Sequence, residues 1–183
     1  MLEELLVKYS SPTLAGLKTG NIFLCPYSDI CAMRDDLRTF NKCLYPKGIR
    51  VLPLSYKTGK ALIYIYRISM LKSDLLDSTA CSLLNSIGYD TENPELCIKE
   101  LIKRLSLEES FPHEVGLFIG YPPEDVYGFI ANKAKECKCV GCWKVYGDAE
   151  KAQKTFEKYK KCTNAYCAQY AKGITIEQLA VAG

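Results

Sequence analysis

The residues best suited to chemistry in this chain of 183 amino acids are its ten cysteines. Cys139 and Cys142 have the two-residue gap of a metal-binding knuckle, and Gly141 permits a tight turn between them. Cys137 precedes this pair, and Cys162 follows on a predicted helix. We therefore expect a thiol-based metal or redox site at Cys139, Cys142 and Cys162, with zinc or an iron–sulfur cluster as the cofactor.

Helix and strand geometry limit this site. Cys162 and Cys167 are five residues apart, which places them about 140° apart around an unbroken helix. Both reach one metal only if the helix breaks near Thr163 and Asn164. Strand residues three apart also face opposite ways unless Gly141 forms a turn or bulge. Ordinary reduced cysteines, some of them in the core, are the alternative interpretation.

A second hypothesis is a thiol-dependent enzyme with Cys25 as nucleophile and His113 as base. Cys25 ends a predicted strand just before a helix N-terminus, where the helix dipole stabilises a thiolate. His113 would activate this thiol, and Glu114 or Asp125 would orient the imidazole. The alternative is a buried thiol and a structural histidine, because no local motif flanks either residue.

A third hypothesis is a non-catalytic module that binds a small molecule or a protein. Tyr121 and Trp143, the single tryptophan, are the candidates for binding a ligand or cofactor, and an apolar pocket beside them would favour this hypothesis. The loop 120–123 precedes a predicted helix, a place where anions often bind. Glu124 and Asp125 occupy the first turn of that helix and would repel a phosphate, so a structural turn is expected.

Charge and composition narrow the partners. The formal net charge of +3 is small and indicates no particular partner. Residues 133–161 are rich in lysine with interspersed aromatics, but acidic residues dilute the charge, so we expect a solvated helix face rather than a nucleic-acid site. The partners expected are instead a small molecule or a redox protein. No phosphate loop or dinucleotide fingerprint occurs in the sequence.

The ends and apolar runs of the chain bear on its location. The first ten residues, MLEELLVKYS, carry acidic residues where a signal peptide carries basic ones. The longest purely apolar run, residues 61–66, is far too short to span a bilayer. We expect a cytoplasmic protein without a membrane partner.

Hydrophobic periodicity predicts the elements that position these residues. In the first half we expect helices at 1–9, 12–20 and 29–44, a strand at 21–25, and a hairpin of strands 49–55 and 60–66, the second of them central. In the second half we expect helices from Ser73 and Asn93, a strand at 114–119, a helix at 123–131, a strand at 138–146 and a long helix at 148–173. The order predicts an α/β or α+β fold, one domain over residues 1–183, with a mixed sheet of about five strands and helices packed on it.

Several motifs resemble those of one protein family. They are SPTLAG at 11–16, PKGI at 46–49, FPHEVGLFIGYP at 111–122, EDV at 124–126, GCWKVY at 141–146 and KCT at 161–163. The chain is similar over nearly its whole length to a family of uncharacterised proteins from anaerobic, clostridia-type bacteria, catalogued as a domain of unknown function. The resemblance implies a bacterial, cytosolic, single-domain protein and no particular activity. An anaerobic host would preserve free thiols and oxygen-sensitive clusters, which favours the first hypothesis.

Overall fold

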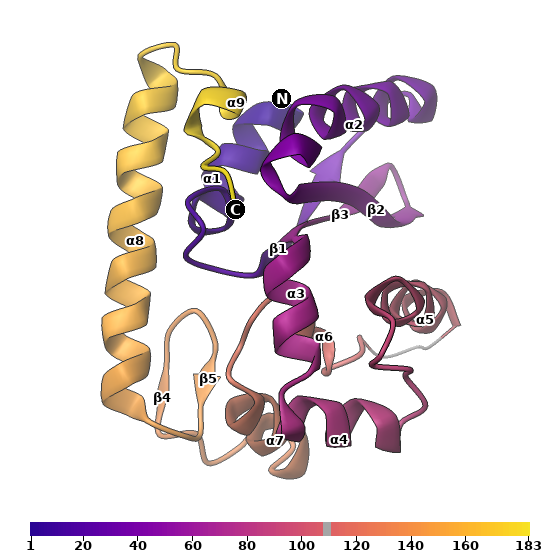
Figure 1. The fold of residues 1–183 in the computed structure, drawn as a ribbon, viewed down its shortest axis with the longest axis vertical. Coiled ribbons are helices and arrows are strands. Elements are labelled where there is room, and N and C mark those ends of the chain that lie inside the picture. The colour runs from indigo at the N-terminus through magenta and orange to yellow at the C-terminus, as the bar shows by residue number, and fades with distance from the viewer. Residues whose placement is uncertain (108–110) are drawn as a thin grey trace. The chain divides into compact units, whose positions relative to one another are not determined.

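A computed structural model describes residues 1–107 and 111–183 (Figure 1). The chain forms two compact units, Met1–Met70 with Lys161–Gly183, and Leu71–Lys160. The fold is α+β, with one three-stranded sheet in the first unit and one two-stranded sheet in the second. A single domain over residues 1–183 stays a prediction. Within the described residues, no helix is both long enough and apolar enough to cross a membrane.

The sheet of the first unit is antiparallel throughout, with strand order β1–β3–β2. Its strands are β1 (Gly20–Pro26), β2 (Ile49–Lys57) and β3 (Lys60–Arg67). The prediction that the second hairpin strand lies in the centre is confirmed. β3 is buried on both faces, because Ile63 and Ile65 alternate with Tyr64 and Tyr66 and all four are buried.

Helices of the first unit pack on this sheet (Figure 1). α1 (Leu2–Leu14) contacts β1 and β3, α2 (Ile30–Leu44) contacts β2, and α9 (Ile176–Leu179) contacts α1. A short 3-10 turn, η1 (Tyr45–Lys47), follows α2. Asp29 caps α2, since its carboxylate accepts a hydrogen bond of 2.8 Å from the Cys31 backbone N–H.

The predicted break between helices at 1–9 and 12–20 is wrong. α1 is continuous to Leu14 and contains Pro12 in its last turns. A proline there removes one intrahelical hydrogen bond, while Ser10, Pro12 and Leu14 are all buried. Burial of this segment outweighs the lost bond. The chain then leaves the helix through Gly16, whose φ of 72° lies in the left-handed region.

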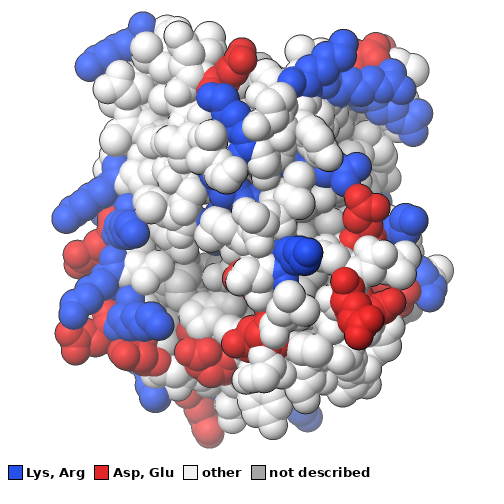
Figure 2. Space-filling model, viewed as in Figure 1, with Lys and Arg blue, Asp and Glu red and all other residues white. Residues whose placement is uncertain are grey.

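The second unit is mainly helical. Its elements are α3 (Ile68–Leu75), which begins in the first unit, α4 (Ser78–Ser86), α5 (Pro94–Leu107), α6 (Val115–Phe118), α7 (Pro123–Ala131), β4 (Cys139–Val140), β5 (Lys144–Val145) and α8 (Ala149–Ala171), whose last residues belong to the first unit. β4 and β5 form an antiparallel hairpin. On the surface of α8, Figure 2 shows basic side chains interspersed with acidic ones, and Lys154 lies 2.6 Å from Glu150, as expected of a solvated helix face.

Three predictions about the sheet are wrong. The segment expected as a strand at 114–119 is the helix α6, and the strand expected at 138–146 pairs over only two residues on each side of a turn. The described residues contain no mixed sheet of five strands and no parallel strand pair. The apolar run after His113 is buried on all sides, and such a run does not distinguish a helix from a buried strand.

Candidate functional site

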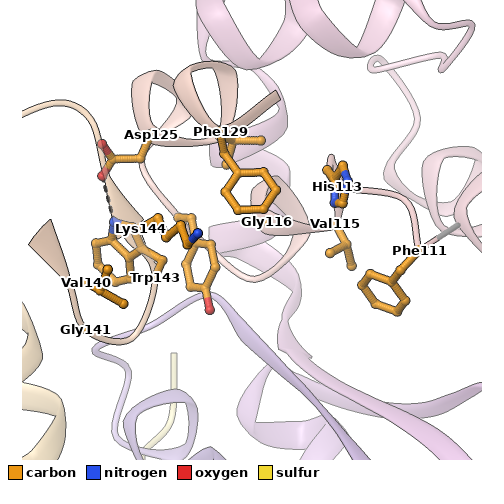
Figure 3. A pocket seen from close by; sticks show the side chains of 12 residues that line it. Phe111, His113, Val115, Gly116, Asp125, Phe129, Val140, Gly141, Trp143 and Lys144 are labelled. Atoms are coloured by element: carbon orange, nitrogen blue, oxygen red, sulfur yellow. Dashed lines mark hydrogen bonds between the residues drawn. The ribbon is translucent and has the colours of Figure 1, made fainter. Parts of the chain in front are cut away.

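The second unit contains a cavity of about 300 Å³, the aromatic pocket, beside α6, α7 and the β4–β5 hairpin (Figure 3). Its walls carry the aromatic side chains of Phe111, His113, Tyr121, Phe129 and Trp143, together with Lys144 and Asp125. Both residues that the sequence assigned to ligand or cofactor binding, Tyr121 and Trp143, therefore line one cavity. Their role in binding stays a prediction.

Trp143 is the centre of a small aromatic core below the hairpin. Only 8% of its surface is exposed, its ring centroid lies 4.9 Å from that of Tyr121, and the Phe156 ring of α8 meets it edge-on at 4.5 Å. Gly141 lies against the same Phe156 ring, so closely that a Cβ atom at this position would overlap it. Packing from α8 therefore holds the hairpin turn and the indole ring in place.

Asp125 joins α7 to the hairpin. It is 3% exposed, and its Oδ2 atom accepts a hydrogen bond of 2.7 Å from Trp143 Nε1 (Figure 3). Its Oδ1 atom accepts bonds of 2.7 Å from the backbone N–H groups of Tyr146 and Gly147. Sequence reasoning considered this residue only as a partner of His113 or a repeller of phosphate. The one local signal in the sequence was its position in the first turn of a predicted helix. That position does not indicate which N–H groups Asp125 binds.

Tyr121 packs against the indole ring and is held by a hydrogen bond to the hairpin. Its hydroxyl donates a 2.9 Å hydrogen bond to the backbone carbonyl of Cys142. Burial, with a smaller contribution from the nearby Cys142 thiol, raises the pKa of Tyr121 to about 12, so its phenol is neutral near pH 7. Gly116 permits this packing, because a Cβ atom there would lie 2.8 Å from the Val126 side chain and 3.1 Å from the Tyr121 ring.

His113 and Glu114 are adjacent in sequence but have different surroundings. The His113 side chain is exposed, and its ring centroid lies 5.0 Å from that of Phe129. Glu114 is 6% exposed, accepts a 2.9 Å hydrogen bond from the Tyr89 hydroxyl and lies 3.7 Å from Arg104 Nη1. Glu114 thus belongs to a buried cluster with Tyr89 and Arg104. The orientation of His113 by Glu114 stays a prediction.

The cysteines of the predicted metal site lie on the hairpin and on α8. The chain turns between Cys139 and Cys142, as the spacing required. In this turn the Gly141 N–H donates a 3.0 Å hydrogen bond to the Trp143 carbonyl. α8 is unbroken through Cys162 and Cys167, so the break needed to turn both thiols to one metal does not occur. Among residues 1–107 and 111–183, no three His, Cys, Asp or Glu side chains form a group that could hold a metal ion. The zinc or iron–sulfur site stays a prediction.

Cys25 lies where the sequence placed it, near the end of β1 and before α2, but its thiol is fully buried. Its Sγ atom lies 3.5 Å from the Pro26 carbonyl oxygen. Burial is the largest influence on this group and raises the pKa of the Cys25 thiol, the opposite of the change that activates a nucleophile. Its pairing with His113 stays a prediction, and the raised pKa weighs against it.

These environments predict the order in which thiols react. At about pH 8 we expect iodoacetamide to alkylate the exposed Cys31 and Cys142 at least about tenfold faster than Cys25 and Cys97. Burial raises the pKa of Cys97 to about 11 and also raises that of Cys25, so their thiolates become abundant only at higher pH. Peptide mass spectrometry over time measures the rates, and urea should equalise them. Labelling of Cys25 first would restore it as a nucleophile.

Comparison with known proteins relates this chain to a protein family. A family model described as a protein of unknown function, DUF3793, matches residues 6–180. No curated protein and no solved structure matches the chain. The resemblance to a domain of unknown function is confirmed to this extent: the chain belongs to the DUF3793 family of proteins of unknown function.

Proposed function

We propose that this protein is a non-catalytic binding module that holds a small, largely apolar molecule in the aromatic pocket. The observation that carries the proposal is the cavity of about 300 Å³ walled by aromatic rings beside Tyr121 and Trp143. Ligand sites are typically concave, mostly apolar and furnished with a few polar groups, and this pocket has that composition.

The size of the pocket limits its ligand. A volume of about 300 Å³ is at the lower end of the range for small-molecule sites. It is roughly twice the ~150 Å³ of a cavity that takes up benzene. A molecule of one or two fused rings fits this space, whereas a nucleotide or a larger cofactor would extend far outside it.

The polar groups of the pocket support binding more than catalysis. General acid–base catalysis needs a group that exchanges a proton near neutral pH. The Tyr121 phenol, with a pKa of about 12, stays protonated there, and its hydroxyl already donates to the protein backbone. The Asp125 carboxylate accepts three hydrogen bonds from the hairpin. Both groups are therefore engaged in holding the shape of the pocket.

The single tryptophan makes the proposal directly testable, because Trp143 is itself part of the pocket wall. We expect the neutral probe 2-naphthol to quench its fluorescence in a saturable manner. Phe129→Ala, which removes one aromatic wall, should weaken binding about tenfold.

Tyr127→Ala is the matched control. It removes an aromatic ring from the same helix, but this ring is 60% exposed and does not line the pocket. We expect its affinity for 2-naphthol to equal that of the unsubstituted protein. Absence of saturable quenching, or an equal loss in the two variants, would contradict the proposal.

A further inference from the structure

We propose that the aromatic pocket is selective for planar aromatic acids, whose anionic group binds the Lys144 ammonium while the ring lies among Tyr121, Phe129 and Trp143. This inference rests on the proposed binding function and adds the chemical class of the ligand. It depends on one cation placed in an otherwise aromatic site.

Aromatic walls alone would fit two opposite kinds of ligand. Neutral or anionic rings stack on them, and quaternary ammonium groups bind the faces of such rings through cation–π attraction. Lys144 favours a neutral or anionic ring over a cationic ligand. Figure 3 shows its side chain between Trp143 and Phe129, and its Nζ atom lies 6.0 Å from the centroid of the Phe129 ring. A cation is thus already present at the rings, and a second one would be repelled at low dielectric.

The position of the Lys144 ammonium is set by the protein. Lys144 begins β5 and is half-buried, and its Nζ atom donates a 2.8 Å hydrogen bond to the Ala134 carbonyl. That carbonyl belongs to the loop after α7, where Lys133 and Ala134 have φ values of 49° and 62°. An ammonium carries three N–H donors, so this bond leaves donor capacity for an acceptor in the pocket. A carboxylate is the acceptor that forms the strongest bond with it.

Asp125 does not cancel this selectivity. Its two oxygens accept bonds from one indole and two backbone N–H groups, so they point toward the hairpin and not toward a ligand. It also lies in the first turn of α7, where the positive end of the helix dipole offsets its charge. Lys144 is consequently the charged residue of the pocket lining that has N–H donors available for a ligand. His113 lies at the exposed side beyond Phe129 and can add a further donor (Figure 3).

Three probes with one ring system test the inference: 2-naphthoate, its neutral amide 2-naphthamide, and the cation 2-naphthyltrimethylammonium. Affinities follow from quenching of Trp143. We expect naphthoate to bind at least about tenfold more tightly than the amide, and the cation to bind most weakly. Lys144→Met should reduce naphthoate affinity about tenfold and change amide affinity less than about twofold. Lys158→Met, on the exposed surface of α8, is the control of equal charge and should change neither.

The amide separates the two possible failures. If no probe binds the unsubstituted protein, the proposed binding function is wrong. If the amide binds as tightly as naphthoate, or if Lys144→Met leaves naphthoate affinity unchanged, the pocket binds apolar rings but the assignment of aromatic acids is overturned. Unchanged amide binding by Lys144→Met also shows that the pocket is intact in the variant.

Discussion

Asp125→Ala is expected to lower the free energy of unfolding by about 3–5 kcal/mol and to abolish binding in the aromatic pocket. The substitution removes the acceptor for Trp143 Nε1 and for the N–H groups of Tyr146 and Gly147. These donors are at least partly buried, so they would lose their protein acceptor without full access to water. The hairpin would separate from α7, and the pocket would lose one wall.

Urea denaturation followed by Trp143 fluorescence measures this loss, because the indole ring reports on the hairpin itself. Asp125→Asn should have an intermediate effect, since an amide keeps one acceptor oxygen but points N–H donors at other donors. Glu124→Ala is the matched control, an exposed carboxylate in the same helical turn, with an expected change within about 0.5 kcal/mol. A stable Asp125→Ala protein that still binds 2-naphthol would show that the hairpin is held by other contacts.

Arg67→Met should destabilise the first unit by a similar amount, about 3–5 kcal/mol. Arg67 is 3% exposed at the end of β3, and its guanidinium donates to three backbone carbonyls: Thr13 at 2.6 Å and Leu14 at 2.7 Å, at the end of α1, and Val181 at 2.9 Å. The negative end of the α1 dipole compensates the buried charge. Methionine would fill much of the volume but remove the guanidinium donor from all three carbonyls, so that the Thr13 and Leu14 carbonyls would keep only their backbone bonds from Gly16 and Val181.

Circular dichroism during urea denaturation, together with limited proteolysis of the C-terminal residues, measures the effect of Arg67→Met. Proteolytic cleavage should begin near Val181, because its carbonyl loses the guanidinium donor. The bond from the Val181 N–H to the Leu14 carbonyl would remain in the variant. Arg38→Met is the control, because the Arg38 side chain is 75% exposed and its ion pair with Asp35 contributes little. Equal stability of the two variants would mean that water and the remaining backbone bonds satisfy the three carbonyls.

Local signals were sufficient for several elements of the first unit. α2 has an Asp cap and apolar residues at helical spacing, and the hairpin of β2 and β3 turns at Thr58 and Gly59, both with φ > 0. The prediction of β3 as the central strand followed from apolar residues on both of its faces. Each of these features depends on residues within one turn or one strand pair, so neighbouring residues contain the necessary information.

Other elements depended on packing that sequence spacing does not contain. α6 was expected as a strand because VGLFI is apolar throughout, and only its surroundings decide between helix and strand. α1 continues through Pro12 because the segment is buried. The expected five-stranded mixed sheet joined the segment 138–146 to distant strands, whereas residues around Gly141 turn and pair with each other.

The sequence by itself narrowed the fold to the α/β or α+β class and determined the antiparallel hairpin whose second strand is central in the first sheet. It also indicated the two aromatic residues, Tyr121 and Trp143, beside which a pocket could form. Only the tertiary structure decided that Asp125 holds the hairpin and that Lys144 lies at the rings. The reason is physical. Burial and hydrogen bonds between residues about twenty positions apart set the environment of a charged side chain, and residue type alone does not specify those partners.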